Sequence, residues 1–398
     1  MIIGGGGFVG LSLALALARE GLAVTVVDPV TPAAAARETF DGRVSALSFA
    51  TVRMFRALGL WPDLEPDTQP IEQILVTDAR LGQPASPFSL HFDGEEIGTS
   101  LGVIAENRVL RRTLYAAVGR EPRIRLIAPA KVTALTVETV SATAILADGA
   151  TLTAPLVVAA DGRESPLRTA MGIRTVDWSY AQTGIVTTVR HQHPHHGVAY
   201  EHFLPAGPFA ILPLTGNRSS LVWTEAAETA AAMMARDDAA FLAEIARRFG
   251  DHLGAVVCEG PRWSYPLRFH LAREYVRPRF ALAGDAAHGI HPIAGQGLNL
   301  GLRDAAALAE VIADAAGLGR DIGALDVLQG YQRWRRFDNA TAGLTMDGLN
   351  RLFANDIAPL RAIRDLGLGL VDQIGPLRRF LMREAGGDTG KLPKLMRE

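Results

Sequence analysis

The first 28 residues, MIIGGGGFVGLSLALALAREGLAVTVVD, decide the fold of this chain. A short apolar run at Met1–Ile3 precedes a glycine cluster, and a helix rich in Leu and Ala is predicted over Leu11–Glu20. Gly21 ends this helix, and Ala23–Val27 predicts a buried, valine-rich strand. The order strand, glycine turn, helix and strand indicates the βαβ start of a doubly wound α/β fold.

The glycines of this stretch match the pattern G-x-G-x-x-G at Gly5, Gly7 and Gly10. Gly5 permits a tight turn, Gly7 lets the backbone approach a pyrophosphate, and Gly10 lets the helix pack closely on the sheet. The helix N-terminus then offers free N–H groups to the phosphates. Asp28 ends the next strand, where an acidic group meets ribose hydroxyls. The pattern predicts a dinucleotide site and does not choose between FAD and NAD; a tight turn without a ligand is the alternative.

Composition excludes several classes of protein. The chain has 398 residues, a formal net charge of −2 and no strongly basic character, so nucleic acid is not expected as a partner. Cys258 is the one cysteine, which rules out an internal disulfide. No apolar run of about 20 residues is present, so no membrane-spanning helix is expected. Because strands usually have about 5–6 residues, the stub at Met1–Ile3 leads us to expect that the natural start lies upstream.

Periodicity along the rest of the chain predicts alternating kinds of structure. A loop is expected at residues 29–42. Antiparallel strands are expected at residues 71–97 and 131–152, and a separate antiparallel sheet at 183–225; Leu156–Ala160 and Phe280–Ala283 are predicted as short buried strands. Helices are predicted at Ser45–Leu58, Asn107–Val118, Ala239–Phe249 and Leu298–Ala315, and the chain is expected to be mostly helical after Leu325.

A second motif follows the strand at Phe280–Ala283. In Gly284-Asp285, the aspartate can accept a hydrogen bond from a ribityl hydroxyl, and the glycine removes side-chain bulk beside a cofactor. Alone, the pair would be an ordinary strand-end turn. It is followed by HPIAGQGLNLGLRD at His291–Asp304, whose glycines would bring N–H groups to a flat, electron-rich ring. The helix that begins at Leu298 would aim its positive end at the same ring.

These two stretches resemble the signature of the ubiquinone-biosynthesis aromatic hydroxylases, which belong to the class A flavoprotein monooxygenases typified by para-hydroxybenzoate hydroxylase. Three more stretches resemble that family: Asp41–Ser48, Val157–Arg168 and the substrate-facing Ala199–Leu214. In Glu106–Leu110, Asn107 stands where the wider class often has an FAD-contacting arginine, so either Arg108 takes that role or neither residue binds.

The resemblance implies a set of FAD-contacting residues, and Arg43, Asp161 and Gly162 enter the set through their motifs. No catalytic triad and no metal are expected, and the phenol-activating residue is not identified. His291, Pro292 and Gln296 are expected around the flavin ring. The full cofactor-binding set is Gly5, Gly7, Phe8, Val9, Gly10, Asp28, Arg43, Asn107, Arg108, Val132, Asp161, Gly162, Gly284, Asp285, Pro292, Gly295, Gln296, Gly297, Leu298 and Asn299.

The resemblance also implies a fold and a domain order. The expected fold is α/β: a Rossmann-like FAD-binding domain with an inserted antiparallel-sheet substrate domain and a helical C-terminal region. The FAD-binding domain would be discontinuous, at residues 1–75, 98–175 and 268–345. The substrate domain would comprise 76–97 and 176–267, and the C-terminal helical region 346–398.

The implied reaction is the hydroxylation of a polyprenylated phenol in ubiquinone biosynthesis. NAD(P)H would serve as transient reductant and O2 as co-substrate, through a flavin C4a-hydroperoxide, with the cofactor carrying the difficult chemistry. Two alternatives stay open: a class A hydroxylase of a small soluble aromatic acid, and a flavin-holding subunit of a biosynthetic complex. A cytoplasmic location is expected, with peripheral contact at the inner face of the membrane and a complex with other ubiquinone-biosynthesis proteins as options.

Three weaker features have plain interpretations. His191, His193, His195 and His196 fit no standard metal spacing and are interpreted as a loop between strands. Cys258 is interpreted as an incidental thiol. The segment Leu344–Met382 intersperses apolar residues with Arg351, Arg361, Arg364, Arg378 and Arg379, which predicts either a helix pair packed on the body or a membrane-surface or partner face.

Overall fold

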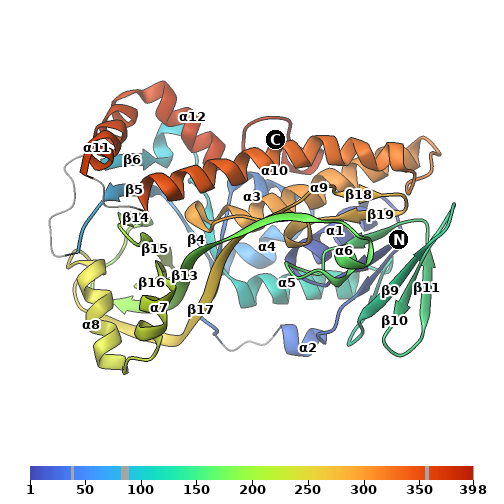
Figure 1. Ribbon diagram of the computed structural model, residues 1–398, viewed down its shortest axis with the longest axis horizontal. Helices are drawn as coiled ribbons and strands as arrows, with labels where there is room; N and C mark the ends of the chain where they lie inside the picture. The colour runs from blue at the N-terminus through green and yellow to red at the C-terminus, as the bar shows by residue number, and fades with distance from the viewer. Residues whose placement is uncertain (37–39, 82–88, 355–357, 398) are drawn as a thin grey trace.

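The computed structural model describes residues 1–36, 40–81, 89–354 and 358–397 (Figure 1). A mostly parallel sheet lies beneath the long helices at one end of the molecule, and a second, larger sheet lies at the other end. The first sheet has the spatial order β18 (Val276–Arg277), β19 (Phe280–Leu282), β12 (Val157–Ala159), β1 (Ile2–Gly4), β2 (Val24–Val27) and β8 (Ile124–Ile127).

The first strand lies in the middle of this sheet. Ile3 of β1 is in register with Val158 on one side and with Val26 on the other, and both pairings are parallel. A strand covered on both faces is expected to be apolar throughout, and the short strands β1, β2 and β12 are apolar almost without interruption. The predicted βαβ start and the buried strands near residues 157 and 280 are therefore confirmed.

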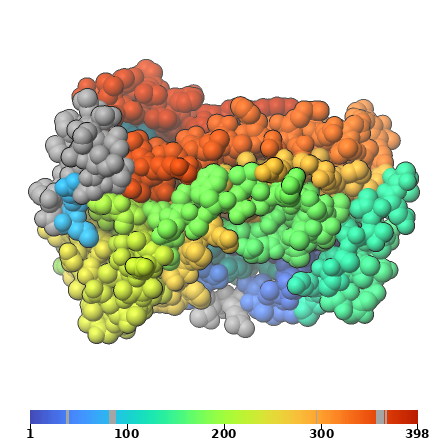
Figure 2. All heavy atoms as spheres, viewed as in Figure 1, coloured from blue at the N-terminus to red at the C-terminus, as the bar shows by residue number. Residues whose placement is uncertain are grey.

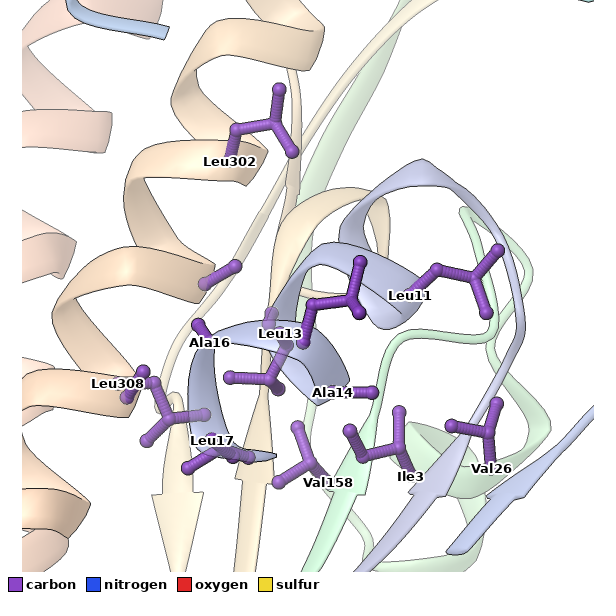
Figure 3. Packing of buried hydrophobic residues seen from close by; sticks show 14 of the residues in the cluster. Ile3, Leu11, Leu13, Ala14, Ala16, Leu17, Val26, Val158, Leu302 and Leu308 are labelled. Carbon is purple, nitrogen blue, oxygen red and sulfur yellow. The ribbon is translucent and has the colours of Figure 1, made fainter. Parts of the chain in front are cut away.

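Helix α1 (Phe8–Arg19) packs one face of this sheet and is buried along most of its length. Its Leu and Ala side chains contact the sheet on one side and helix α9 (Gln296–Gly317) on the other (Figure 3). Leu13 and Leu17 are completely buried, and each such leucine stabilises the fold by about 1.5–3 kcal/mol. Small residues, such as Ala16 on the α9 side of α1 and Gly301 of α9, let the two helices approach closely (Figure 3).

The larger sheet carries both of the chain's long strands. Its spatial order is β20 (His288–Gly289), β17 (Val256–Ala272), β13 (Thr175–His191), β16 (Arg218–Ala226), β15 (Gly207–Leu214), β14 (Val198–Leu204), β5 (Gln73–Asp78) and β6 (Ser89–Asp93). The pairings are antiparallel except that β14 runs parallel to β5, so the sheet is mixed rather than purely antiparallel. Strands β13 and β17 run from this sheet toward the nucleotide half of the molecule (Figure 1).

The two faces of the larger sheet have different neighbours. Helices α7 (Ala227–Met234) and α8 (Asp238–Phe249) cover the outer face, where Ile185, Phe209 and Trp223 form a core with Phe241. The opposite face is called the inner face below. It packs against the 291–296 segment and the C-terminal helices, for example through Phe203, which is in one cluster with Ile293 and Phe353.

Two small sheets and the remaining helices complete the described fold. A hairpin sheet consists of β9 (Val132–Val137), β10 (Ala142–Leu146) and β11 (Thr151–Ala154), as predicted, and another sheet of β3 (Val44–Leu47), β7 (Val103–Glu106) and β4 (Thr68–Pro70). The other helices are α2 (Pro32–Ala35), α3 (Phe49–Ala57), α4 (Trp61–Leu64), α5 (Asn107–Arg120), α6 (Pro166–Ala170), α10 (Leu325–Phe353), α11 (Ala358–Gln373) and α12 (Gly375–Ala385).

The structure corrects the helix predicted at Ser45–Leu58. Residues Val44–Leu47 form strand β3, which pairs with β7, and the helix begins only at Phe49. The reason is Ser48: its Oγ accepts a hydrogen bond from the backbone N–H of Thr51 at 3.3 Å and so caps α3. Helix α9 begins at Gln296 rather than Leu298, and the loop predicted at 29–42 contains α2. Residues 37–39 and 82–88 of the predicted segments lie outside the described residues.

Helices α10, α11 and α12 confirm the prediction that the chain is mostly helical after Leu325. Within the described ranges, no helix is both long and apolar enough to cross a bilayer. Residues 76–97 supply strands to the same sheet as β13 and β17. The domain boundaries themselves stay a prediction.

Candidate functional site

A cavity of about 440 Å³ opens where β1, β2 and β12 end at the same edge of the parallel sheet. Ligands of open α/β sheets bind at this carboxyl edge. Six of the predicted cofactor-binding residues line the cavity: Gly5, Gly7, Asp28, Val132, Asp161 and Gly162. Its other lining residues were missed, although all except Ala130 neighbour a predicted one or belong to the 157–168 motif: Gly4, Val27, Pro29, Ala130, Lys131, Ala160, Pro166 and Leu167.

The glycines of the first turn are held by close packing. Gly5 has φ +107°, and a Cβ there would lie 2.2 Å from the Ala160 carbonyl oxygen. A Cβ on Gly10 would lie 2.0 Å from the Gly5 carbonyl oxygen. Gly7 differs, because a Cβ there would meet nothing within 4 Å, and this exposed residue is the N-cap of α1. Gly5 and Gly10 therefore build the turn, and Gly7 leaves open space in front of the helix N-terminus, where a phosphate fits.

Asp28 faces the cavity and also braces the turn. Its carboxylate accepts hydrogen bonds from the backbone N–H of Gly6 at 2.5 Å and of Val30 at 2.7 Å. Tyr115 of α5 donates its hydroxyl to the Gly6 carbonyl at 3.1 Å. Asp28, the acid predicted to bind ribose, therefore fixes the glycine loop.

Asp161 belongs to the same cavity, and its carboxylate accepts hydrogen bonds from Ser165 Oγ at 2.5 Å and from the Leu167 N–H at 3.1 Å. Burial raises the pKa of Asp161 above its ordinary value in spite of these bonds. A loop with a cavity-facing acid, a glycine turn and a helix N-terminus fits the ribose and pyrophosphate of a dinucleotide.

The predicted group around Arg43 and Asn107 forms a polar cluster. Arg43 pairs with Asp41 at 2.6 Å and lies over the Trp263 ring. Asn107 Oδ1 accepts a hydrogen bond from Ser45 Oγ at 2.7 Å, and Arg108 pairs with Glu106 at 2.6 Å. These residues lie together, but none lines the 440 Å³ cavity.

Arg111 was missed by sequence reasoning. It lies one turn after Asn107 in α5, pairs with Asp41 at 3.4 Å and covers the half-buried Phe8 ring. The signal that could have found it is the spacing of Asn107 and Arg111, which are neighbours on one face of a helix.

The Gly284-Asp285 turn follows β19, as predicted. Gly284 is buried, and a Cβ there would come within 2.9 Å of the Val9 side chain. Val9 also approaches Gly301 of α9, so it packs α1 against both segments. Asp285 is exposed, which leaves its carboxylate accessible to a ligand.

The start of α9 joins the second motif to strand β3. Gly295 has φ +62° and is the N-cap of α9, and a Cβ there would be 3.2 Å from Ala46. Asn299 Oδ1 accepts hydrogen bonds from the Ser48 N–H at 3.0 Å and from Thr51 Oγ1 at 2.8 Å, and its Nδ2 donates to the Ala46 carbonyl at 3.0 Å. Asn299 is therefore occupied in holding protein segments together.

The other predicted residues of this segment differ in their freedom. The Gln296 amide donates to the Ala385 carbonyl at 2.9 Å. Gly297 is half-buried and a Cβ there would meet nothing within 4 Å. Pro292 and Leu298 are also half-buried, and Leu298 packs against the main core.

Sequence reasoning missed a buried charged network behind this loop. Asp304 of α9 is completely buried and contacts His288 Nε2 at 2.6 Å and Arg335 Nε at 2.8 Å. Its carboxylate also accepts hydrogen bonds from Asn339 Nδ2 at 3.0 Å and from the Gly284 N–H at 3.2 Å. Burial alone would raise the pKa of Asp304, but the facing His288, Arg335 and Asn339 lower it to about 2. The network ties the Gly284 turn to α9 and α10.

His291 lies where the 291–296 segment meets the inner face of the larger sheet. It is fully buried, its Nε2 has no hydrogen-bond partner among the described residues, and burial lowers its pKa to about 4. Tyr180 of β13 contacts it edge to face, with ring centroids 4.9 Å apart. Burial and the Asp347 carboxylate raise the pKa of Tyr180. His291 is thus a neutral imidazole at ordinary pH.

The weaker features take ordinary places. His191 ends β13, and His195 Nε2 lies 2.7 Å from the Leu214 carbonyl oxygen, so both serve the β13–β14 connection. Among the described residues, no group of side chains is arranged to hold a metal ion. Burial raises the pKa of the half-buried Cys258 thiol, which makes it less reactive. Arg364 is buried against Asp78, and Arg378 pairs with Glu96.

Known proteins are similar to this chain in sequence and in structure. A family model described as an FAD binding domain matches residues 1–335. The ubiquinone hydroxylase UbiL of Rhodospirillum rubrum is 48% identical over all of this chain and 92% of its own length. The 3-demethoxyubiquinol 3-hydroxylase of Escherichia coli is 35% identical, over 96% of this chain and 97% of its own. In structure, p-nitrophenol 4-monooxygenase PnpA from Pseudomonas putida superposes with a TM-score of 0.80 at 20% identity, over 98% of each chain, which shows a common fold.

Proposed function

Because the chain belongs to the family of FAD-dependent hydroxylases of ubiquinone biosynthesis, we propose that it hydroxylates the aromatic ring of a polyprenylated phenol, with NAD(P)H as transient reductant and O2 as co-substrate. One observation carries the proposal most directly. The 291–296 loop packs on the inner face of the larger sheet, whose clusters there are apolar. This juxtaposition suits a cofactor ring held against a hydrophobic aromatic substrate.

The proposed FAD site has two parts. Gly5, Gly7, Gly10 and Asp28 shape the end for the pyrophosphate and the ribose, together with the 161–162 turn, as the cavity and its packing indicate. The exposed Asp285 carboxylate would accept hydrogen bonds from the ribityl chain. When bound, FAD supplies the redox chemistry, because it accepts a hydride from NAD(P)H and activates O2 for insertion of one oxygen atom into a ring C–H bond.

The chain's own residues then have three tasks. The N-terminus of α9, with the N–H group of Gly297 in its first turn, stabilises negative charge in front of it. His291 and Pro292 close the loop beside the proposed ring position, and the neutral His291 adds no positive charge there. The apolar side chains of the inner face exclude water from the substrate.

The buried arginines weigh against a small aromatic acid as substrate. A carboxylate clamp needs a buried arginine that is free to face the ligand. Arg335 is held by Asp304 and Arg364 by Asp78, with distances of 2.8 Å and 2.7 Å. Neither guanidinium is available for this role, so the proposal is a substrate without a carboxylate.

The experiment uses the FAD-loaded protein with a short-chain 2-prenylphenol, NADH or NADPH, and ¹⁸O2. We expect a hydroxylated product that carries one ¹⁸O atom, and faster NAD(P)H oxidation when the phenol is added. Pyridine nucleotide oxidation that yields only hydrogen peroxide with every prenylphenol tried would refute the proposal. Bound FAD that NAD(P)H cannot reduce, with or without the phenol, would instead support the flavin-holding subunit.

We further propose that the α11–α12 corner contacts the cytoplasmic face of the membrane, from which a polyprenyl tail would enter. Four apolar side chains are exposed there: Leu370, Ile374, Leu377 and Phe380. The exposed Arg379 and Arg383 lie in the same helix, α12. An exposed apolar patch with basic neighbours suits an anionic lipid surface. Figure 2 shows α12, in red, at the end of the molecule opposite the β9–β11 hairpin.

This surface is tested by sedimentation with vesicles that contain anionic lipid. Phe380→Asp combined with Leu377→Asp should release the protein from the vesicles, because it places two carboxylates against the lipid. Val140→Asp is the control, since Val140 is an apolar residue that is even more exposed, 71% accessible, in the distant hairpin. Equal vesicle binding by both variants would contradict the proposed contact. If the double variant instead loses a protein partner from cell extracts, a biosynthetic complex uses this face.

A further inference from the structure

Among the described residues, the carboxylate of Glu201 in the larger sheet has no hydrogen-bond or ion-pair partner, and it lies on the sheet face that the proposed function gives to the substrate. Strand β14 alternates its side chains between the two faces. Tyr200 and Leu204 belong to the outer face with α8. Ala199 and Phe203 belong to inner-face clusters, and Glu201, between them, therefore also lies on the inner face.

The two clusters that flank Glu201 adjoin the 291–296 segment, which is expected around the flavin ring. Ala199 packs in a cluster that includes Ala46 of β3, which touches Gly295. Phe203 packs in a cluster that includes Ile293. Glu201 is thus positioned on the sheet face that looks toward the N-terminus of α9, where the aromatic ring of the substrate is placed by the proposed function.

The surroundings of Glu201 are apolar. Its register neighbours are Ala210 on β15 and Val76 on β5. No hydrogen bond or ion pair to its carboxyl group is found within the part of the chain that the structure describes. The side chain is half-buried, so it keeps contact with accessible space, and burial raises its pKa to about 7.

Other charged groups near this face are either paired or unable to titrate near neutral pH. Asp78 of β5 is bound by Arg364 of α11. His291 is neutral, because burial lowers its pKa to about 4. Burial and the Asp347 carboxylate raise the pKa of Tyr180, and Asp347 itself pairs with Arg351 of α10. His202, the next residue, points to the other face and contacts Thr77 at 2.7 Å.

We propose that Glu201 is the catalytic base that accepts the phenol proton of the substrate. This inference rests on the proposed function. A Glu201 carboxylate oxygen forms a bond to the proton as the phenol O–H bond breaks, and the electron pair of that bond stays on the phenol oxygen. The products are a neutral carboxyl group and a phenolate, whose ring is richer in electrons and reacts faster with an electrophilic oxygen. No further reactant is needed for this step.

The proposed role of Glu201 can be tested by ligand binding alone, without catalytic turnover. A phenol O–H that donates to the Glu201 carboxylate favours its charged form, so binding should release protons near pH 7. We would titrate the FAD-loaded protein with a short-chain 2-prenylphenol, without reductant, and follow release with an indicator dye. The methyl ether of the same phenol has no O–H to donate and should bind without release. Equal proton release by phenol and ether would overturn the proposal, even if every variant below failed to fold.

The variant Glu201→Gln keeps the shape and removes the base. Proton release should disappear and product formation should fall by about 10²-fold or more, while the Kd for the phenol changes only a few-fold. Glu228→Gln is the matched control, because Glu228 is an exposed glutamate just after strand β16. Retained FAD absorbance shows that each variant is folded.

The outcomes separate this inference from the proposed function. If the wild-type protein makes no hydroxylated product but Glu201→Gln still abolishes proton release, the proposed reaction fails and the role of Glu201 in binding a hydroxylated ring stands. If the wild-type protein hydroxylates the phenol and Glu201→Gln does so at a rate within three-fold of it, the assignment of Glu201 is wrong.

Discussion

Asp304→Asn is the perturbation for which the structure gives the clearest magnitude. The carboxylate is completely buried and is held by His288, Arg335, Asn339 and the Gly284 N–H. Its pKa of about 2 lies about two units below the ordinary value, which corresponds to about 2–3 kcal/mol in favour of the charged form. The substitution also leaves the buried Arg335 without this counter-charge, and removing one partner of a buried pair costs about 3–5 kcal/mol. We expect the free energy of unfolding to fall by about 3–5 kcal/mol.

Asp338→Asn is the matched control for this prediction. Asp338 contacts the same Arg335 at 2.8 Å, but its side chain is 32% exposed, so its loss should cost at most about 1 kcal/mol. Urea unfolding of the apoproteins measures both, provided that the slope with urea is unchanged. If the two variants lose equal stability, the buried network does not have the importance inferred for it.

The same carboxyl group makes a prediction about acid. Its folded pKa is depressed, so its contribution to stability is fully present above the unfolded value of about 3.9 and is lost as the pH falls toward 2. Asp304→Asn should therefore lose less stability than the wild type as the pH falls from about 4 to about 2. Parallel stability curves for the wild type and the variant across that window would contradict the sign.

The remaining predictions concern the turn and the loop. Gly7→Ala should lower FAD affinity but leave the apoprotein's melting temperature unchanged, because its Cβ meets only open space. Gly10→Ala should lower both the affinity and the melting temperature, since its Cβ would lie 2.0 Å from the Gly5 oxygen. Flavin fluorescence quenching measures the affinity and calorimetry measures the melting temperature. Burial lowers the pKa of His291 and of His270 to about 4, so the folded protein binds fewer protons than the unfolded chain between about pH 6.5 and 4, and stability should fall as the pH falls through that range. For His291→Gln, the urea midpoint of unfolding should change less with pH in that range than it does for the wild type. An unchanged slope would show that His291 does not titrate as inferred.

Local sequence was sufficient for the nucleotide half of the fold. The first 28 residues carry their own instructions, because an apolar strand, a glycine turn and a helix of Leu and Ala can each be read from neighbouring residues. The strand before Gly284 and the helix α9 after it can likewise be predicted from neighbouring residues. Helix α3 was placed too early because a strand before a serine cap and a continuous helix have similar local patterns, and pairing with β7 decided between them.

Roles within the site depend on contacts that sequence motifs do not report. Asn299 belongs to the motif, yet it ties α9 to Ser48 and Thr51, which are 251 and 248 residues away in the chain. The network of Asp304 draws on His288 and Arg335, and no spacing rule connects those residues.

The opening glycines, the Gly284-Asp285 turn and the 291–304 segment are short-range patterns, and the sequence by itself determined from them that the chain has a dinucleotide fold of the flavin-binding kind. Whether a carboxylate has a hydrogen-bond or ion-pair partner depends on residues that are distant in the sequence. Glu201 is one of many glutamates in the sequence, and only the pairing of β14 with β5 and β15 places it in apolar surroundings on the inner face. The physical reason is that helix and turn formation depends on near neighbours, whereas burial and charge pairing depend on residues that the tertiary fold brings together.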